Sequence, residues 1–80
     1  MIRYTKHALE AMAKRGLAAS WIEATVKAPD SVESDPRHPE RTRSFKAIPQ
    51  LGSRVLRVVH RLDGADMIII TAHLDRGAKR

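Results

Sequence analysis

The stretch "RVLRVVHRLDGADMIIITAHL", residues 54–74, decides the fold. Two largely apolar runs, 54–61 and 66–74, flank the dipeptide Asp63-Gly64. Runs of this length on either side of Asp-Gly are typical of two antiparallel strands joined by a tight turn. We therefore expect a hairpin here, and we expect it to form the centre of an antiparallel sheet.

Alternation along the two runs predicts which face of the sheet is buried. In the second run Ile68, Ile70, Ala72 and Leu74 share one wholly apolar face, which we predict to be the core face. The other face then carries Met67, Ile69, Thr71 and His73, and it is the more open one. In the first run Arg57 and Arg61 share a face with Val55 and Val59, whereas Leu56, Val58 and His60 share the opposite face with Arg54.

Two short helices are predicted before this hairpin. Thr5 is a suitable N-cap for a helix over 6–15, and Gly16 is placed to end it in a left-handed conformation. A second helix over 20–28 begins with "SWIE", which fits a capping box formed by Ser20 and Glu23. Pro29 then stops the helix.

The middle of the chain predicts a short strand around Val32, a polar loop, and a further strand over 41–48. That strand places Arg41, Arg43 and Phe45 on one side. We expect the final residues "GAKR" to form a basic frayed tail. The order of elements predicts one α+β domain, residues 1–80, with both helices packed on one face of a three- to four-stranded antiparallel sheet. The helix residues predicted to be buried in its core are Leu9, Met12, Ile22 and Val26.

Composition narrows the classes of function. The chain has 80 residues, a formal net charge of +6 and no cysteine, so it has no disulfide framework and we expect an acidic partner. The four histidines lack the spacing of a zinc site, and we expect no cofactor and no metal. The longest apolar run is far too short to span a membrane, and the N-terminus lacks a secretory signal, so we expect a cytoplasmic protein.

The basic and histidine residues suggest a site for a polyanion. His7 and Arg15 share one face of the first helix, where they either form one wall of a basic site or lie in solvent; His7 could also be a buried anchor between helix and sheet. The sheet adds a basic set that acidic residues do not balance, which favours an anion-binding surface over merely solubilising charge. The set comprises Arg41, Arg43, Arg57 and Arg61. Because aromatic residues are few, a base-stacking platform is poorly supported.

The segments "YTKHALEAMAKRGL", "SWIEATVKAPDSV" and "VLRVVH…MIIITAHL" resemble a small, mostly bacterial family, the domain of unknown function 4258. His7, Met12, Arg15, Gly16 and Pro29 match its pattern. The family more usually has arginine at the position of Ala11.

This family is similar to the BrnT and RelE-like toxins, small basic ribonucleases whose helices pack on an antiparallel sheet. The resemblance implies a metal-independent endoribonuclease of a toxin–antitoxin system, with RNA as substrate and an antitoxin protein as partner. It implies His7 or His73 as acid or base and Arg15 beside them, with the arginines of the sheet on phosphates. The alternative is a non-catalytic basic module that binds RNA or an acidic protein. Without its partner we expect a monomer or weak homodimer.

Overall fold

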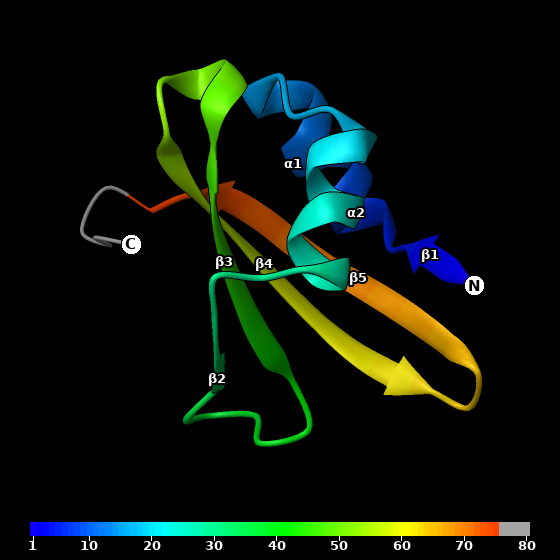
Figure 1. The fold of residues 1–80 in the computed structure, drawn as a ribbon. Coiled ribbons are helices and arrows are strands. Elements are labelled where there is room, and N and C mark those ends of the chain that lie inside the picture. The colour runs from blue at the N-terminus through cyan, green and yellow to red at the C-terminus, as the bar shows by residue number, and fades with distance from the viewer. Residues whose placement is uncertain (76–80) are drawn as a thin grey trace.

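The computed structural model describes residues 1–75 and shows an α+β fold with two helices on one side of a five-stranded mixed sheet (Figure 1). The predicted basic tail lies outside the described residues. No helix within 1–75 is both long and apolar enough to cross a membrane. The elements are β1 (Ile2–Tyr4), α1 (Lys6–Arg15), α2 (Ala19–Lys27), β2 (Ser31–Ser34), β3 (Thr42–Ile48), a 3-10 turn (Pro49–Leu51), β4 (Arg54–Asp63) and β5 (Asp66–Leu74).

The sheet has the strand order β1-β5-β4-β3-β2. The predicted hairpin lies at its centre, and β2 to β5 pair antiparallel as expected. The prediction of three or four antiparallel strands is wrong at the N-terminal edge, where β1 adds a fifth strand parallel to β5 and pairs Ile2 with Met67. Three residues are too few to show an alternating pattern, so this strand is defined only by its distant partner.

The turn of the hairpin confirms the interpretation of Asp63-Gly64. Asp63 pairs with Asp66, which leaves a two-residue loop, and Gly64 has a φ of +61°. Glycine adopts this left-handed conformation without the steric cost that a Cβ atom imposes.

A bulge in β5 overturns part of the predicted alternation. Val59 pairs with Thr71 but His60 pairs with Ile69, so Ile70 has no partner on β4. The extra residue shifts the phase of the strand, and Ile69 joins Ala72 in the core beneath the helices. Ile68 is buried, as predicted, but it lies on the opposite face from Ala72.

Thr5 connects this bulge to the start of α1. Its hydroxyl accepts a hydrogen bond from the backbone N–H of Ala8 at 3.0 Å, which confirms the predicted N-cap. The same hydroxyl donates to the carbonyl of Ile70 at 3.0 Å, while the N–H of Thr5 donates to the carbonyl of Ile69. At the other end of the helix Gly16 has the predicted left-handed conformation.

Helix α1 packs against β5 through small side chains. Ala8 and Ala11 are buried, and Met12 is half-buried against the core as predicted. The prediction for Leu9 is wrong, because its side chain is 53% exposed. The alanines allow the helix to lie close to the strand, and this orientation turns position 9 toward solvent.

Helix α2 begins one residue earlier than predicted. Its N-cap is Ala18, which has no side chain able to cap, and the predicted capping box of Ser20 and Glu23 does not form because Ser20 already lies inside the helix. Leu17 is buried directly after Gly16. Because Leu17 is buried, Ala18 is the one residue between it and the first residue of the helix, and Ala18 becomes the N-cap. Tertiary packing thus overrides the local capping signal of Ser20.

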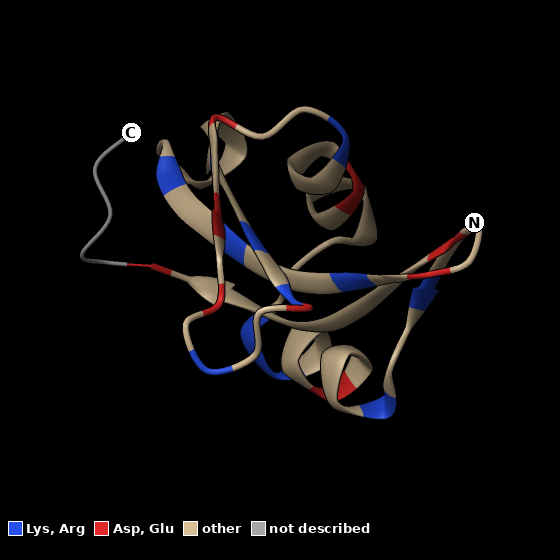
Figure 2. Ribbon diagram, turned by 90° about the horizontal axis from the view of Figure 1, so that it is seen from below, with Lys and Arg blue, Asp and Glu red and all other residues tan. Residues whose placement is uncertain are grey.

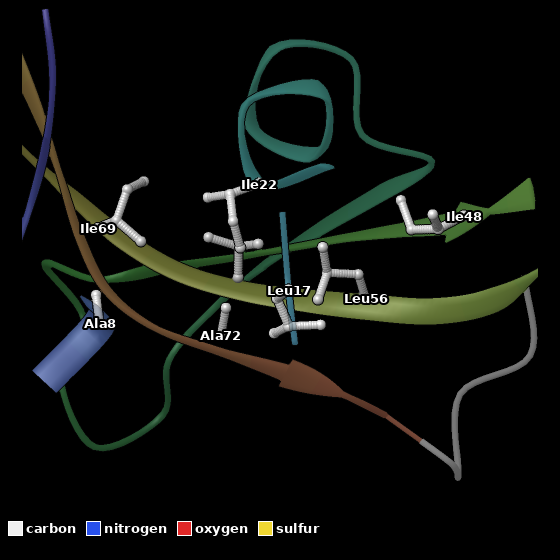
Figure 3. Close-up of a cluster of buried hydrophobic side chains, with 8 residues drawn as sticks. Ala8, Leu17, Ile22, Ile48, Leu56, Ile69 and Ala72 are labelled. Carbon is white, nitrogen blue, oxygen red and sulfur yellow. The ribbon is translucent and has the colours of Figure 1, made fainter. Parts of the chain in front are cut away.

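The core lies between the helices and the sheet (Figure 3). The prediction that Ile22 is buried is confirmed. Val26 and Leu74, which were also predicted to be buried, are half-buried and pack around the core. The buried cluster consists of Ala8, Leu17, Ile22, Ile48, Leu56, Val58, Ile69 and Ala72.

Candidate functional site

The side of the sheet away from the helices, which we call the open face, collects the predicted basic residues of β3 and β4. The register places Phe45 opposite Arg57, and Arg57 opposite His73. One row further, Arg43 lies opposite Val59. Arg43, Arg57 and His73 therefore come from three adjacent strands to one surface.

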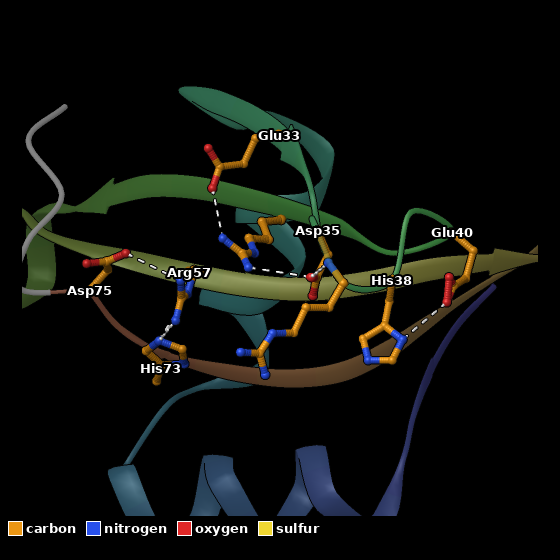
Figure 4. Close-up of polar contacts among 9 residues, drawn as sticks. Glu33, Asp35, His38, Glu40, Arg57, His73 and Asp75 are labelled. Atoms are coloured by element: carbon orange, nitrogen blue, oxygen red, sulfur yellow. Dashed lines mark hydrogen bonds and ion pairs between the residues drawn. The ribbon is translucent and has the colours of Figure 1, made fainter.

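Arg57 and His73 are in direct contact (Figure 4). The Nε–H of Arg57 donates a hydrogen bond to Nε2 of His73 at 3.0 Å, and a terminal nitrogen of the same guanidinium also contacts Nε2. A guanidinium has donors only, so Nε2 must be the unprotonated ring nitrogen and Nδ1 carries the hydrogen. The contact thus requires a neutral His73 and defines its tautomer.

Charge and burial act on His73 in the same direction. Burial lowers the pKa of His73, and the positive charges of Arg57 and Arg15 lower it further, against a smaller opposite effect of Asp75. Asp75 also forms an ion pair with Arg57 at 3.8 Å. His73 is therefore neutral near pH 7, in the protonation state that a general base needs.

Arg43 is neutralised by carboxylates of β2 and the loop after it. Its guanidinium lies 3.2 Å from Glu33 and 3.5 Å from Asp35. A backbone hydrogen bond from Arg37 holds the pKa of Asp35 below its ordinary value, and Arg43 contributes to this lowering. Figure 2 shows acidic positions beside basic positions of neighbouring strands. The expectation that acidic residues do not balance the basic set is therefore wrong for Arg43, and in part for Arg57.

Arg41 and Arg61 keep their charge uncompensated. Thr42 pairs with His60, so Arg41 and Arg61 occupy the next positions of the two neighbouring chain segments. Neither forms an ion pair or side-chain hydrogen bond with another residue among 1–75. They are the half of the predicted basic set that is most available to an anion.

A depression of about 340 Å³ lies beside His73. It is lined by Arg15 of α1, Arg54 of β4, His73 and Leu74. Arg15 and His73, which were predicted to act together, are thus brought to one place. Arg54 was not predicted as a site residue. The alternation assigned it to the same face as the apolar Leu56, and a charged residue at the end of a strand does not by itself indicate a site.

His7 does not reach this place. It lies in the first turn of α1, exposed, while Arg15 lies eight residues later, about 12 Å further along the helix axis. The side chain of His7 forms no hydrogen bond or ion pair within the described part of the chain. The interpretation of His7 as a buried anchor is wrong, and the structure does not bring it together with His73.

The two remaining histidines have other surroundings. His60 is 7% exposed beneath the helices, and its Nε2 lies 2.8 Å from Oγ of the buried Ser44. Burial lowers the pKa of His60. His38 lies exposed in a loop, 3.6 Å from Glu40. Within residues 1–75, no three histidine, aspartate or glutamate side chains gather in a way that could hold a metal ion.

Comparison with known protein families gives a match over most of the chain. A family model described as a domain of unknown function (DUF4258) matches residues 4–73, which include both helices, Arg57 and His73. No curated protein and no solved structure matches the chain.

Proposed function

Because this chain belongs to the DUF4258 family, as its sequence resemblance indicated, we propose that it is the toxin of a toxin–antitoxin pair and cleaves RNA without a metal ion. The proposal includes the distant relationship of the family to BrnT and RelE-like toxins. The observation that carries it is the contact of Arg57 with a neutral, half-buried His73 on a basic sheet face.

Binding begins with the RNA backbone on the open face. Arg41 and Arg61 have guanidiniums without a carboxylate partner in the described structure, and the whole chain carries a net charge of +6. Cations of this kind neutralise phosphates and displace counterions, which gives affinity without base specificity. Phe45, the one aromatic residue of β3, is buried and offers no exposed ring for base stacking.

His73 then accepts a proton. A phosphate near Arg57 competes with the imidazole for the guanidinium, because an ion-paired hydrogen bond is stronger than one to a neutral acceptor. Release of Arg57 frees the lone pair on Nε2 of His73. Nε2 removes the proton from a ribose 2′-hydroxyl, whose oxygen attacks the adjacent phosphorus.

The arginines stabilise the charge that develops. As the P–O5′ bond breaks, Arg57 and Arg15 lie near His73 and offset the negative charge of the phosphorane. The products are a 2′,3′-cyclic phosphate and a 5′-hydroxyl, whose oxygen takes a proton from water. The protonated His73 then gives its proton to the hydroxide that remains, which restores the neutral imidazole. In this scheme the antitoxin, an acidic protein in the same cytoplasm, covers the open face and excludes RNA.

A second candidate is a non-catalytic basic module for RNA or an acidic protein. Two specific observations favour it. Arg57 donates a hydrogen bond to Nε2 of His73, so the lone pair that a general base needs is already engaged. His7, the other candidate proton carrier, lies at the far end of α1. Such a module would use the same arginines without proton transfer.

Cleavage of total RNA in EDTA tests the proposal. Purified protein should cleave RNA in the chelator, and His73→Gln should lower the rate about 100-fold while RNA binding remains. His7→Gln serves as the matched control. Binding without any cleavage by the wild-type protein would favour the non-catalytic module.

A further inference from the structure

We infer that the depression lined by Arg15, Arg54, His73 and Leu74 binds a terminal phosphate monoester. The inference rests on the proposed function for the identity of the chain that carries the phosphate, which is RNA. The site lies beside the proposed cleavage centre and adds Arg54, a residue that the cleavage scheme does not use.

The first argument is charge. Arg15 and Arg54 come from different elements, yet they border the same small space, and of the described residues that line it none is acidic. Neither arginine forms an ion pair with another residue of 1–75. Two like charges facing one space repel each other, and an anion between them removes that repulsion.

The second argument is the donor on His73. Because Nε2 accepts from Arg57, the other ring nitrogen carries a hydrogen, so the imidazole is able to donate one hydrogen bond without adding charge. Two guanidiniums and one N–H are donors only, a combination that suits the oxygen atoms of a phosphate.

The third argument is the kind of phosphate. A monoester carries between −1.5 and −2 charges near pH 7 and thus matches two guanidiniums, whereas the phosphodiester inside a chain carries a single charge. A space of about 340 Å³ is at the small end of ligand pockets, suited to a phosphate with its ribose rather than to several nucleotides. Leu74 supplies an apolar wall for the sugar carbons.

Short oligonucleotides test the inference. We would measure binding of a 2′-O-methyl tetranucleotide, which lacks the hydroxyl needed for cleavage, with a 5′-phosphate, a 3′-phosphate or hydroxyl ends. One phosphorylated form should bind the wild-type protein about tenfold more tightly than the hydroxyl form, and Arg54→Gln should remove this gain. The matched control Arg61→Gln, on the same strand but outside the depression, should weaken all three forms alike. Measurable binding that is equal for the three forms in the wild-type protein would overturn the inference.

Ribose 5-phosphate separates this inference from the proposed function. It should shift the NMR resonances of His73 and Leu74 in the wild-type protein but not in Arg54→Gln, whose fold is checked by circular dichroism. If it binds in this way while no oligonucleotide binds, the phosphate site stands and the RNA-directed function is refuted. If ribose 5-phosphate leaves these resonances unchanged, the phosphate site is refuted. The cleavage of total RNA in EDTA then still tests the proposed function separately.

Discussion

Arg57 donates a hydrogen bond to Nε2 of His73 across the β4–β5 pair, and this contact holds the imidazole in its neutral form. The two residues lie directly opposite each other in the strand register, 16 positions apart in the chain. Their pairing makes the protonation of His73 depend on Arg57.

Replacing Arg57 should raise the pKa of His73. Arg57→Gln removes a nearby positive charge that lowers this pKa, while burial, the largest cause, persists. The pKa should therefore rise but stay below its ordinary value, which is about 6.5. Titration of the imidazole carbon-bound protons by NMR measures the change. Arg61→Gln, which keeps Arg57 in place, is the control and should leave the pKa of His73 unchanged.

Stability should fall as the pH falls below about 6.5, in part because of His60. The pKa of His60 is lowered by burial in the folded state, so the unfolded chain binds more protons in this range and acid favours unfolding. His60→Gln should flatten the dependence of Tm on pH between pH 7 and 5, whatever its effect on Tm itself. An unchanged slope would contradict the assignment of this dependence to His60. His73→Gln measures the separate contribution of the second histidine with a lowered pKa.

The hydroxyl of Thr5 should be needed for stability. Thr5→Val keeps the shape of the side chain but removes the N-cap of α1 and the donor to the carbonyl of Ile70. We expect a loss of about 1–2 kcal/mol in the free energy of unfolding, measured by urea denaturation. Thr5→Ser retains both hydrogen bonds and should lose much less. Equal losses in the two variants would show that the hydroxyl is not the cause.

His7 should be dispensable. It is exposed and lies at the opposite end of α1 from Arg15, so His7→Gln should change the free energy of unfolding by less than about 0.5 kcal/mol. Cleavage of RNA should also be unchanged, in contrast to His73→Gln. A stable but inactive His7→Gln protein would place the proton transfer at α1 and refute the assignment to His73.

The salt dependence of RNA binding should arise mainly from Arg41 and Arg61, the arginines of the basic set without ion pairs. Replacing Arg41 and Arg61 together with glutamine should reduce the slope of log affinity against log salt by about 1.4, the value for two phosphates of a single strand. Arg43→Gln should change the slope less, because Glu33 and Asp35 already neutralise Arg43. Fluorescence anisotropy at several salt concentrations measures these slopes, and an equal effect of Arg43 would contradict this ranking.

Much of the local structure could be predicted from local signals. Thr5 and Gly16 mark the ends of α1 because a hydroxyl cap and a left-handed residue act within a few positions of the chain. The Asp63-Gly64 turn and its two apolar runs likewise define the hairpin, and alternation along β4 places Arg57 correctly on the open face.

Part of the candidate site could also be predicted, namely that His73 and Arg57 share a face and that Arg15 belongs with them. Arg54 could not, since the depression that it lines is formed by chain segments that are distant in sequence. The neutralisation of Arg43 likewise depends on tertiary placement, because Glu33 of β2 and Asp35 of the loop after it both reach its guanidinium.

The sequence by itself thus determined the helices, the hairpin and the basic character of one sheet face, because capping, turn conformation and alternation act over a few residues. The tertiary structure alone decided the bulge at Ile70, the added strand β1 and the exposure of Leu9. Thr5 must reach the carbonyl of Ile70, and Ala8 must lie flat against β5. These contacts join positions about 65 residues apart. A local sequence pattern therefore does not reflect their contribution to the free energy of folding.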